Sequence, residues 1–196
     1  ILSAGTLGSN EIMLRSKQEG LQVSDTLGSR YSGNGDVLAF AYNTDQEIDG
    51  VGYGDKEPEV NELVGPCITS VIDCRGAAEV DQGFVLEEGS LPGGLSPILP
   101  EAFAAGAGIF GKDTDGGIKD EIQESYRGLL SLLRGPHQGA VDNTQTYLVM
   151  CHDSAEGEFS LKDDKLVLSW PGVGSQPILQ TTARAMALGA EALGGT

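Results

Sequence analysis

Basic residues are scarce in this chain of 196 residues, in which 12 Lys and Arg stand against 29 Asp and Glu. The formal net charge is −17, and the isoelectric point lies near 4.2. A protein that binds DNA, RNA or an anionic membrane surface needs a basic face to neutralise phosphates. The charge balance therefore excludes nucleic acids and anionic lipid surfaces as partners.

Long hydrophobic runs are missing as well. The longest ones, such as residues 37–41 and 147–150, fall far short of the roughly 20 residues that cross a bilayer. We therefore expect no transmembrane segment. Hydrophobic residues still make up 39% of the chain, so it can form a core.

Cysteine and histidine are also rare. Cys67, Cys74 and Cys151 have no CxxC or CxxH spacing, which argues against a disulfide scaffold and a zinc site. His137 and His152 belong to no HExxH motif, and no GxSxG serine elbow accompanies them. We expect both histidines to be structural or exposed, and we expect no metal site.

Glycine, by contrast, is abundant, at 29 of 196 residues against a usual share of ~7%. The glycines are spread through apolar segments, which predicts tight turns and close backbone contacts. Residues 1–5 resemble the end of a buried strand, and residues 181–193 resemble a helix that stops at Gly194 and Gly195. We expect an internal piece of a larger protein.

The amino-terminal segment holds the first candidate site. A strand at residues 1–5 is expected to enter a small-residue turn at 5–10, capped by Ser9 or Asn10, and then a helix at 11–17 that Gly20 ends. A glycine turn between a strand and a helix lets a ligand approach free backbone N–H groups. The turn lacks the third glycine of GxGxxG and the lysine of a P-loop, so it is a weak nucleotide motif on its own.

Apolar patterns predict the other elements. Strands are expected at residues 37–42, 66–74, 83–89, 146–151, 158–161 and 166–170, with the last three forming an antiparallel meander. Helices are expected in an Ala-rich stretch after residue 98, at 121–133 and at 181–193, with a charged loop at 112–120. The fold class is therefore α+β, with an α/β layer at the amino-terminal edge.

Two adjacent carboxylates, Glu87 and Glu88, end the strand at 83–89. Because neighbours in a strand point to opposite faces, only one of them can point into a cavity. Burial among apolar side chains would raise the pKa of that acid and suit it to general base catalysis. The alternative is that both are solvated at the strand end, and Glu88 is expected to be the solvated one.

Four segments point to a family when they are taken together. They are SAGTLGSNEIMLRS at residues 3–16, SGNGD at 32–36, LEEGSLPGGL at 86–95 and the strands between 147 and 170. In this order they resemble the cholesterol oxidase branch of the glucose-methanol-choline (GMC) flavoprotein oxidoreductases. The resemblance covers most of the chain, and residues 112–137 are its least familiar part.

The resemblance implies an FAD enzyme that removes a hydride from an alcohol carbon, often that of a sterol. It implies that Ala4 and Gly5 lie against FAD, that Gly8 and Ser9 open the adjoining helix, and that Asn34 and Gly35 lie near the cofactor. Glu87 matches the glutamate that moves a proton during steroid double-bond isomerisation. The implied domains are an edge of the FAD domain at 1–36, a substrate domain at 37–180 and a helix returning to the FAD domain at 181–196.

The chain departs from the family in several places. Asn10 stands where the signature prefers Pro or Ser, and Glu88 follows the acid where the family is more apolar. The family's GxGxxG and its His and Asn pair are not in the chain, so we expect this polypeptide alone to be inactive and to bind FAD poorly or not at all. The alternative function is a non-catalytic module that binds an apolar ligand or a protein partner without flavin.

Overall fold

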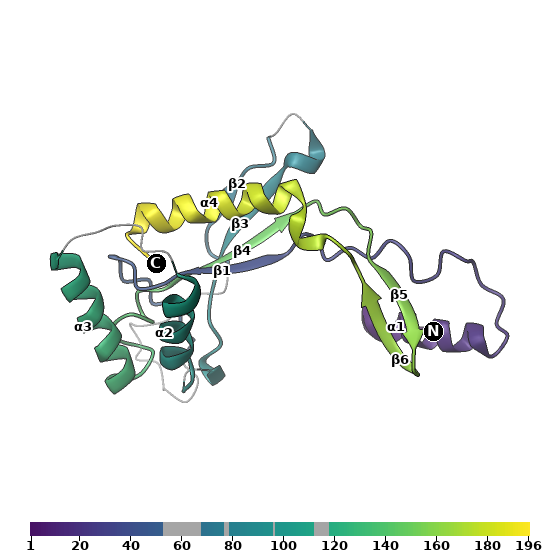
Figure 1. The fold of residues 1–196 in the computed structure, drawn as a ribbon, viewed down its shortest axis with the longest axis horizontal. Coiled ribbons are helices and arrows are strands. Elements are labelled where there is room, and N and C mark those ends of the chain that lie inside the picture. Colours follow the sequence, from purple (N-terminus) through teal and green to yellow (C-terminus); the bar gives the residue numbers. More distant parts are fainter. Residues whose placement is uncertain (53–67, 77–78, 96, 112–117) are drawn as a thin grey trace.

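The computed structural model describes residues 1–52, 68–76, 79–95, 97–111 and 118–196. Its centre is a four-stranded antiparallel sheet in the order β1-β4-β3-β2 (Figure 1). The strands are β1 (Val37–Ala41), β2 (Val71–Asp73), β3 (Phe84–Gly89) and β4 (Gln145–Cys151). The helices confirm the α+β class: α1 (Gly5–Gln18), α2 (Leu99–Phe110), α3 (Ile118–Arg134) and α4 (Pro177–Leu193).

The register of the sheet follows from its apolar side chains. Val149 of β4 lies between Val37 of β1 and Leu86 of β3, and each of the three directs its side chain to the same face. Helix α4 lies along this face and contacts β1, β4 and β3 (Figure 1). The core between helix and sheet contains Ala41, Phe84, Leu86, Tyr147, Val149, Cys151 and Met186.

One glycine of α4 explains how closely the helix approaches the sheet. A Cβ at Gly189 would lie 2.7 Å from the hydroxyl oxygen of Tyr147. A larger residue would push the helix away from β4. Gly194, with a φ of 65°, then ends the helix in the left-handed conformation that glycine adopts without strain.

A second, smaller core lies at the other end of the sheet. It contains Val51, Leu91, Leu99 and Val141, with Phe103 of α2 packed against it. A parallel bridge between Val51 and Leu91 joins two loops there. This core attaches α2 to the loop that follows β3.

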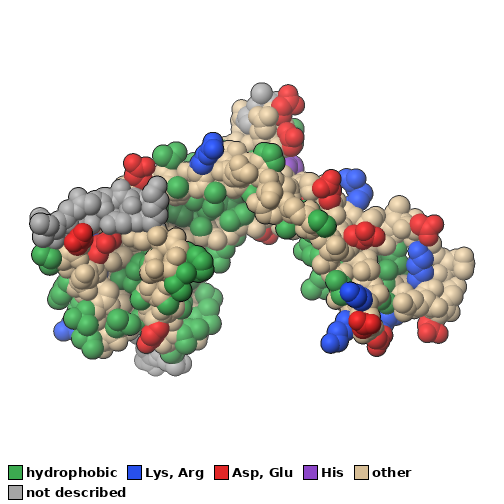
Figure 2. Space-filling view, viewed as in Figure 1, with side chains coloured by type: hydrophobic (Ala, Val, Ile, Leu, Met, Phe, Trp, Pro, Cys, Tyr) green, Lys and Arg blue, Asp and Glu red, His purple; other side chains and the backbone are tan. Residues whose placement is uncertain are grey.

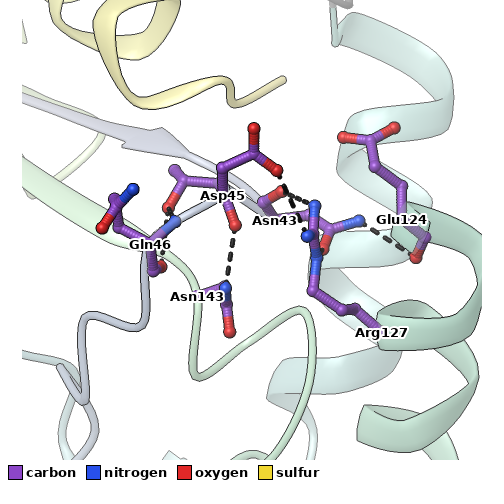
Figure 3. Close-up of polar contacts among 7 residues, drawn as sticks. Asn43, Asp45, Gln46, Glu124, Arg127 and Asn143 are labelled. Carbon is purple, nitrogen blue, oxygen red and sulfur yellow. Dashed lines mark hydrogen bonds and ion pairs between the residues drawn. The ribbon is translucent and has the colours of Figure 1, made fainter. Parts of the chain in front are cut away.

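A polar network attaches α3 to the end of β1 (Figure 3). The Arg127 guanidinium donates to the side-chain oxygen of Asn43 at 2.7 Å and to its backbone oxygen at 2.9 Å. Asn43 is 5% exposed and has a φ of 60°, and its amide donates to the backbone oxygen of Glu124 at 3.2 Å. Asn143, from the loop before β4, donates to the backbone oxygen of Thr44 at 2.8 Å. The turn after β1 is thus fixed by side chains far away in the sequence.

The strands β5 (Glu158–Lys162) and β6 (Lys165–Ser169) form a separate two-stranded hairpin. The expected meander of three strands is therefore wrong, because β4 pairs with β1 and β3 and not with β5. The strand spacing along the chain did not show that residues 152–157 leave the sheet. The hairpin packs on α1, and Figure 1 shows the hairpin and α1 projecting beyond one end of the sheet, the end at which β4 finishes.

The amino-terminal strand and turn are also corrected. Helix α1 begins at Gly5, so the segment expected to be a turn at 5–10 is the first part of a helix, and residues 1–3 are not a strand. Neither Ser9 nor Asn10 caps the helix; the residue at its start is Ala4, whose backbone N–H donates to the Ser9 hydroxyl at 3.2 Å. Contacts between residues four apart stabilise this helix, including the ion pair of Glu11 with Arg15 at 2.7 Å. Gly20 follows its end, as expected.

Other boundaries shift by a few residues. Helix α4 begins at Pro177, which fits the first turn of a helix because it has no N–H to leave unpaired. Helix α3 begins at Ile118, so only residues 112–117 of the expected charged loop lie outside the described residues. Part of the strand expected at 66–74 also lies outside them, as does Cys67. Short 3₁₀ helices occur at Val80–Gln82, Gly93–Leu95 and Val173–Ser175.

Candidate functional site

The face of the sheet that points away from α4 carries the candidate site. We call it the open face; its members are Leu38, Phe40, Val71, Asp73, Val85, Glu87, Thr146, Leu148 and Met150. Alternation along each strand places them opposite the core residues. Leu38 is 59% exposed, Val71 57% and Met150 42%. Figure 2 shows further hydrophobic side chains at the surface between α4 and α2.

Glu87 lies in the middle of the open face. In the register it is opposite Val71 of β2 on one side and Leu148 of β4 on the other. Its Oε2 atom is buried and has no hydrogen-bond partner among the described residues. A buried carboxylate oxygen without a partner is costly for a fold, which marks it as a group that binding or catalysis can use.

Thr146 adds a second polar side chain to the same face of the sheet. Its side chain is 3% exposed, and its Oγ1 atom also lacks a partner within the described part of the chain. Thr146 is opposite Gly89, two residues beyond Glu87 on β3, so both side chains point to the open face. The site thus combines a carboxylate and a hydroxyl in apolar surroundings.

Glu88 lies on the opposite face, beside α4, as strand alternation requires. Its Oε2 accepts hydrogen bonds from the Thr69 hydroxyl at 2.6 Å and the Ser70 hydroxyl at 2.7 Å. Glu88 lines a cavity of about 290 Å³ together with Tyr147 and Gly189. Burial raises the pKa of the Tyr147 hydroxyl. Glu88 is half-buried and its bonds to Thr69 and Ser70 lie at an exposed place, whereas Glu87 Oε2 is buried. Glu88 is thus the more solvated acid of the two, as expected.

The loop with Asn34 and Gly35 is held by a carboxylate of the chain itself. Asp153 Oδ2 accepts hydrogen bonds from the backbone N–H groups of Gly33 at 2.8 Å and Gly35 at 3.0 Å, and from the Ser32 hydroxyl at 3.0 Å. Asn34 and Gly35 have φ values of 58° and 60°, and this turn directs the N–H groups of Gly33 and Gly35 to one point, as in an anion-binding nest. Asp153 occupies the position of the anion.

The electrostatics of Asp153 agree with this geometry. Burial by itself would raise the pKa of Asp153, but the hydrogen bonds from Gly35, Ala155, Ser32 and Gly33 outweigh it and lower the pKa. The neighbouring Cys151 thiol has a raised pKa because it is buried and lies near Asp153 and Asp36. Asp153 is thus an ionised structural group, and the Cys151 thiol stays protonated at neutral pH.

The remaining predicted cofactor residues lie at the start of α1. Ala4 and Gly5 are exposed, and Gly8 and Ser9 are partly exposed. A Cβ at Gly8 would lie 2.9 Å from the Cβ of Ala4, whereas a Cβ at Gly5 would meet nothing within 4 Å. The first turn has no acidic residue, so its free N–H groups and the helix dipole favour a negatively charged group.

The predicted residues lie on three separate elements: α1, the loop before β1, and β3. Sequence reasoning missed Thr146 and Asp153. Alternation along β4 could have placed Thr146 on the face of Glu87, once the two strands were known to be neighbours. No local signal could have found Asp153, whose partners lie 118 to 121 residues earlier in the chain.

Two absences hold for the part of the chain that the structure describes. Its His, Cys, Asp and Glu residues form no group of three that could hold a metal ion. None of its helices is both long enough and apolar enough to cross a membrane.

Comparison of the chain with protein-family models, with curated proteins and with solved structures finds no match in any of the three.

Proposed function

We propose that this chain is part of an FAD-dependent oxidoreductase of the cholesterol-oxidase-like kind, which oxidises an alcohol on an apolar, sterol-like substrate. The observation that supports it most is the position of Glu87, whose unpaired Oε2 is on the same face of the sheet as the unpaired Thr146 hydroxyl. A sterol is a large apolar body with one hydroxyl group. The open face offers apolar contact area and two polar side chains on the same face of the sheet.

Glu87 is the proposed proton carrier. Leu148 and Val71 flank it and its Oε2 atom is buried, which favours a general base that takes a proton from carbon next to a carbonyl. Thr146 is proposed to orient the substrate oxygen. Glu88 takes no part because it faces α4 and is already bonded to Thr69 and Ser70.

The proposed cofactor, FAD, would accept the hydride from the alcohol carbon. The start of α1, with Ala4, Gly5, Gly8 and Ser9, fits a phosphate group because its N–H groups are exposed and no acid lies in its first turn. The N–H groups of Gly33 and Gly35 do not fit a phosphate, since they already bind Asp153. The proposed contact of Asn34 and Gly35 with FAD is therefore limited to the exposed Asn34 side chain.

The first experiment is the visible absorption spectrum of the purified chain beside a version extended to the full open reading frame. A flavin band in the extended protein supports the proposal. An extended protein that is colourless and cannot be reconstituted with FAD contradicts the proposal. It also contradicts the roles proposed for Glu87 and the α1 residues.

The second experiment compares Glu87→Gln with Glu88→Gln in the flavin-containing protein. Glu87→Gln is expected to slow isomerisation of a sterol substrate by roughly 10² or more, with a far smaller effect on oxidation. Glu88→Gln, on the other face of the same strand, is the control and should affect neither step strongly. Equal losses of both activities in Glu87→Gln would contradict the proton-transfer role.

A second candidate is a flavin-free module that binds an apolar ligand. The occupied Gly33–Gly35 nest and the exposed apolar side chains of the open face favour it. Such a module would bind a fluorescent sterol analogue without FAD, and Leu148→Asp would abolish that binding. The flavin proposal predicts that binding strengthens when FAD is present.

A further inference from the structure

We infer that α3 is the dimerisation element of this protein and that it pairs, antiparallel, with α3 of a second copy of the chain. This dimer is independent of the proposed enzymatic function. Three features of α3 support it: the side that it turns to the rest of the protein, the spacing of its exposed apolar residues, and the lack of charge around them.

Polar side chains hold α3 to the rest of the protein. Arg127 bonds to Asn43, as described above. Ser131 is 1% exposed; its hydroxyl donates to the backbone oxygen of Gln138 and accepts from the backbone N–H of Val141 at 3.0 Å. In a typical amphipathic helix of a globular protein, the apolar side faces the core and the polar side faces solvent. In α3, by contrast, polar residues face inward.

The outer side of α3 carries Ile122, Tyr126, Leu129 and Leu133, which we call the α3 stripe. Their exposed fractions are 66%, 61%, 53% and 74%. Successive members are four, three and four residues apart, which is the spacing of the seam residues in a coiled coil. Figure 1 shows α3 at the outer end of the molecule, and Figure 2 shows hydrophobic side chains at the surface over it. The stripe is thus an apolar helix face without a partner among the described residues.

The α3 stripe is complementary to itself. A spacing of four, three and four is the same from either end, so an antiparallel copy aligns all four residues at once. In that register Ile122 lies at the level of Leu133 of the second copy, and Tyr126 lies at the level of Leu129 of the second copy. Such a contact uses the same surface on both copies and closes as a two-fold dimer, which leaves no stripe exposed.

The surroundings of the α3 stripe suit a second copy, although each copy has a net charge of −17. The positions that flank the stripe hold the uncharged residues Gln123, Ser125, Leu130 and Leu132. Residues 121–134 contain two acids and two bases, so this part of the helix has no net charge. A surface for a basic partner would have acids beside the apolar residues, and a surface for an anionic membrane would have bases there. Uncharged flanks favour an identical helix over either partner.

The charges along α3 favour the antiparallel direction. Glu121 lies near the start of the helix and Arg134 at its end. Antiparallel pairing brings each of them to the level of the opposite charge on the second copy, whereas parallel pairing brings like charges to one level. The dipoles of two neighbouring helices also attract each other when the helices are antiparallel.

The size of the α3 stripe predicts a weak dimer. With Leu132, which is 49% exposed, it offers on the order of 500 Å² per copy, so pairing buries about 1,000 Å² in total, the lower end for a specific interface. A Kd of roughly 10–100 µM is therefore expected. Long-range repulsion between the two acidic copies opposes pairing, and salt screens this repulsion. The Kd should fall about threefold or more between about 0.05 and 0.5 M NaCl.

Sedimentation velocity of the 196-residue chain at several concentrations tests the pairing. We expect Leu129→Glu to raise the Kd at least about tenfold, because the change occurs twice in each dimer. The matched control is Leu188→Glu on α4, at a position that is 65% exposed, which should change the Kd by less than about twofold. Thermal unfolding shows that both variants are folded. A parent chain that stays monomeric at about 500 µM, or equal effects of the two substitutions, overturns the inference.

Disulfide cross-linking tests the direction of pairing. Ile122→Cys and Leu133→Cys are made in separate chains that also carry Cys67→Ser and Cys74→Ser, and the two chains are mixed and oxidised. Antiparallel pairing gives the mixed disulfide, because like positions would lie about 16 Å apart along the helix axis. Disulfides between like positions, or no mixed disulfide, overturn the inference. A monomer that binds uncharged phosphatidylcholine vesicles through the stripe assigns it to a lipid surface and also overturns the inference.

Discussion

The Asp153 carboxylate binds the backbone N–H groups of Gly33 and Gly35, which precede it by 120 and 118 residues. Through these bonds it joins the loop before β1 to the segment after β4, at the ends of two neighbouring strands. Its other oxygen, Oδ1, accepts from the backbone N–H of Ala155 at 2.9 Å. One ionised side chain therefore holds two loops in place.

Asp153→Asn should lower the free energy of unfolding by about 1–3 kcal/mol, because an amide cannot accept all the bonds that the two carboxylate oxygens accept. Urea unfolding at pH 7 measures the loss. Glu156→Gln, at an exposed position in the same turn, is the control and should stay within about 0.5 kcal/mol of the parent protein. Equal effects of the two changes would contradict the role of Asp153.

The same carboxylate predicts a pH dependence. The pKa of Asp153 is lower in the folded protein than its ordinary value of 3.8, so its stabilising contribution is present above that value and is lost as the pH falls below it. The parent protein should therefore lose more stability than Asp153→Asn between pH 5 and pH 3. If the free energy of unfolding falls equally with pH in the two proteins, the pKa of Asp153 is not lowered in the folded protein.

Gly35→Ala should lower the free energy of unfolding by more than the cost of placing an alanine at a positive φ. Gly35 has a φ of 60°, and an added Cβ would lie 2.6 Å from the backbone oxygen of Cys151. Gly172→Ala is the matched control, since Gly172 has a φ of 77° but open space around it. We expect the free energy of unfolding to fall by about 1 kcal/mol in the control and by clearly more in Gly35→Ala. Thermal unfolding measures the difference, which isolates the close approach to Cys151.

Arg127→Lys should destabilise the protein by about 1–3 kcal/mol. Lysine cannot reproduce the bonds of the Arg127 guanidinium to both oxygens of Asn43, and the Arg127 side chain is only 11% exposed. The control is Arg134→Lys on the same helix, whose exposed side chain makes one long bond of 3.4 Å to Gln138. A larger effect at Arg134 than at Arg127 would contradict the network of Figure 3.

Thr146→Val should stabilise the protein by about 1 kcal/mol, because it removes a buried hydroxyl that has no partner in the described residues. Thr182→Val is the matched control: Thr182 is also buried, but its hydroxyl donates to the Leu179 oxygen at 3.0 Å. Thr182→Val should therefore destabilise the protein. If the open face binds an alcohol, Thr146→Val should also weaken ligand binding, which sterol titration measures. Destabilisation by Thr146→Val would contradict the unpaired state of its hydroxyl.

The strand and helix segments with strong apolar patterns were predictable from sequence. The strands near residues 37–42 and 83–89 and the helix at 181–193 were predicted to within a few residues. Their pairing was not, because β4 inserts between β1 and β3 from more than 50 residues away and no local pattern records such a neighbour. The helix at 11–17 was predicted, but its start at Gly5 was not, since glycine and serine favour turns, whereas contacts four residues apart stabilise the helix here.

The candidate site was predictable in part. Strand alternation correctly placed Glu87 and Glu88 on opposite faces. The hydrogen bonds of Glu88 were not predictable, because Thr69 and Ser70, which donate to it, belong to the neighbouring strand region. The functions of Glu87 and of the α1 residues remain predictions.

Trp170, the single tryptophan of the chain, lies against the hairpin and not in the sheet. Its ring packs edge-to-face on Tyr31 at 5.8 Å, and Tyr31 in turn packs on Phe159 of β5. Intrinsic fluorescence will therefore report the melting of the hairpin of β5 and β6. Far-ultraviolet circular dichroism is dominated by the helices and follows mainly the rest of the fold. If the two signals separate on heating, their gap in midpoint temperature measures how weakly the hairpin is coupled to the sheet.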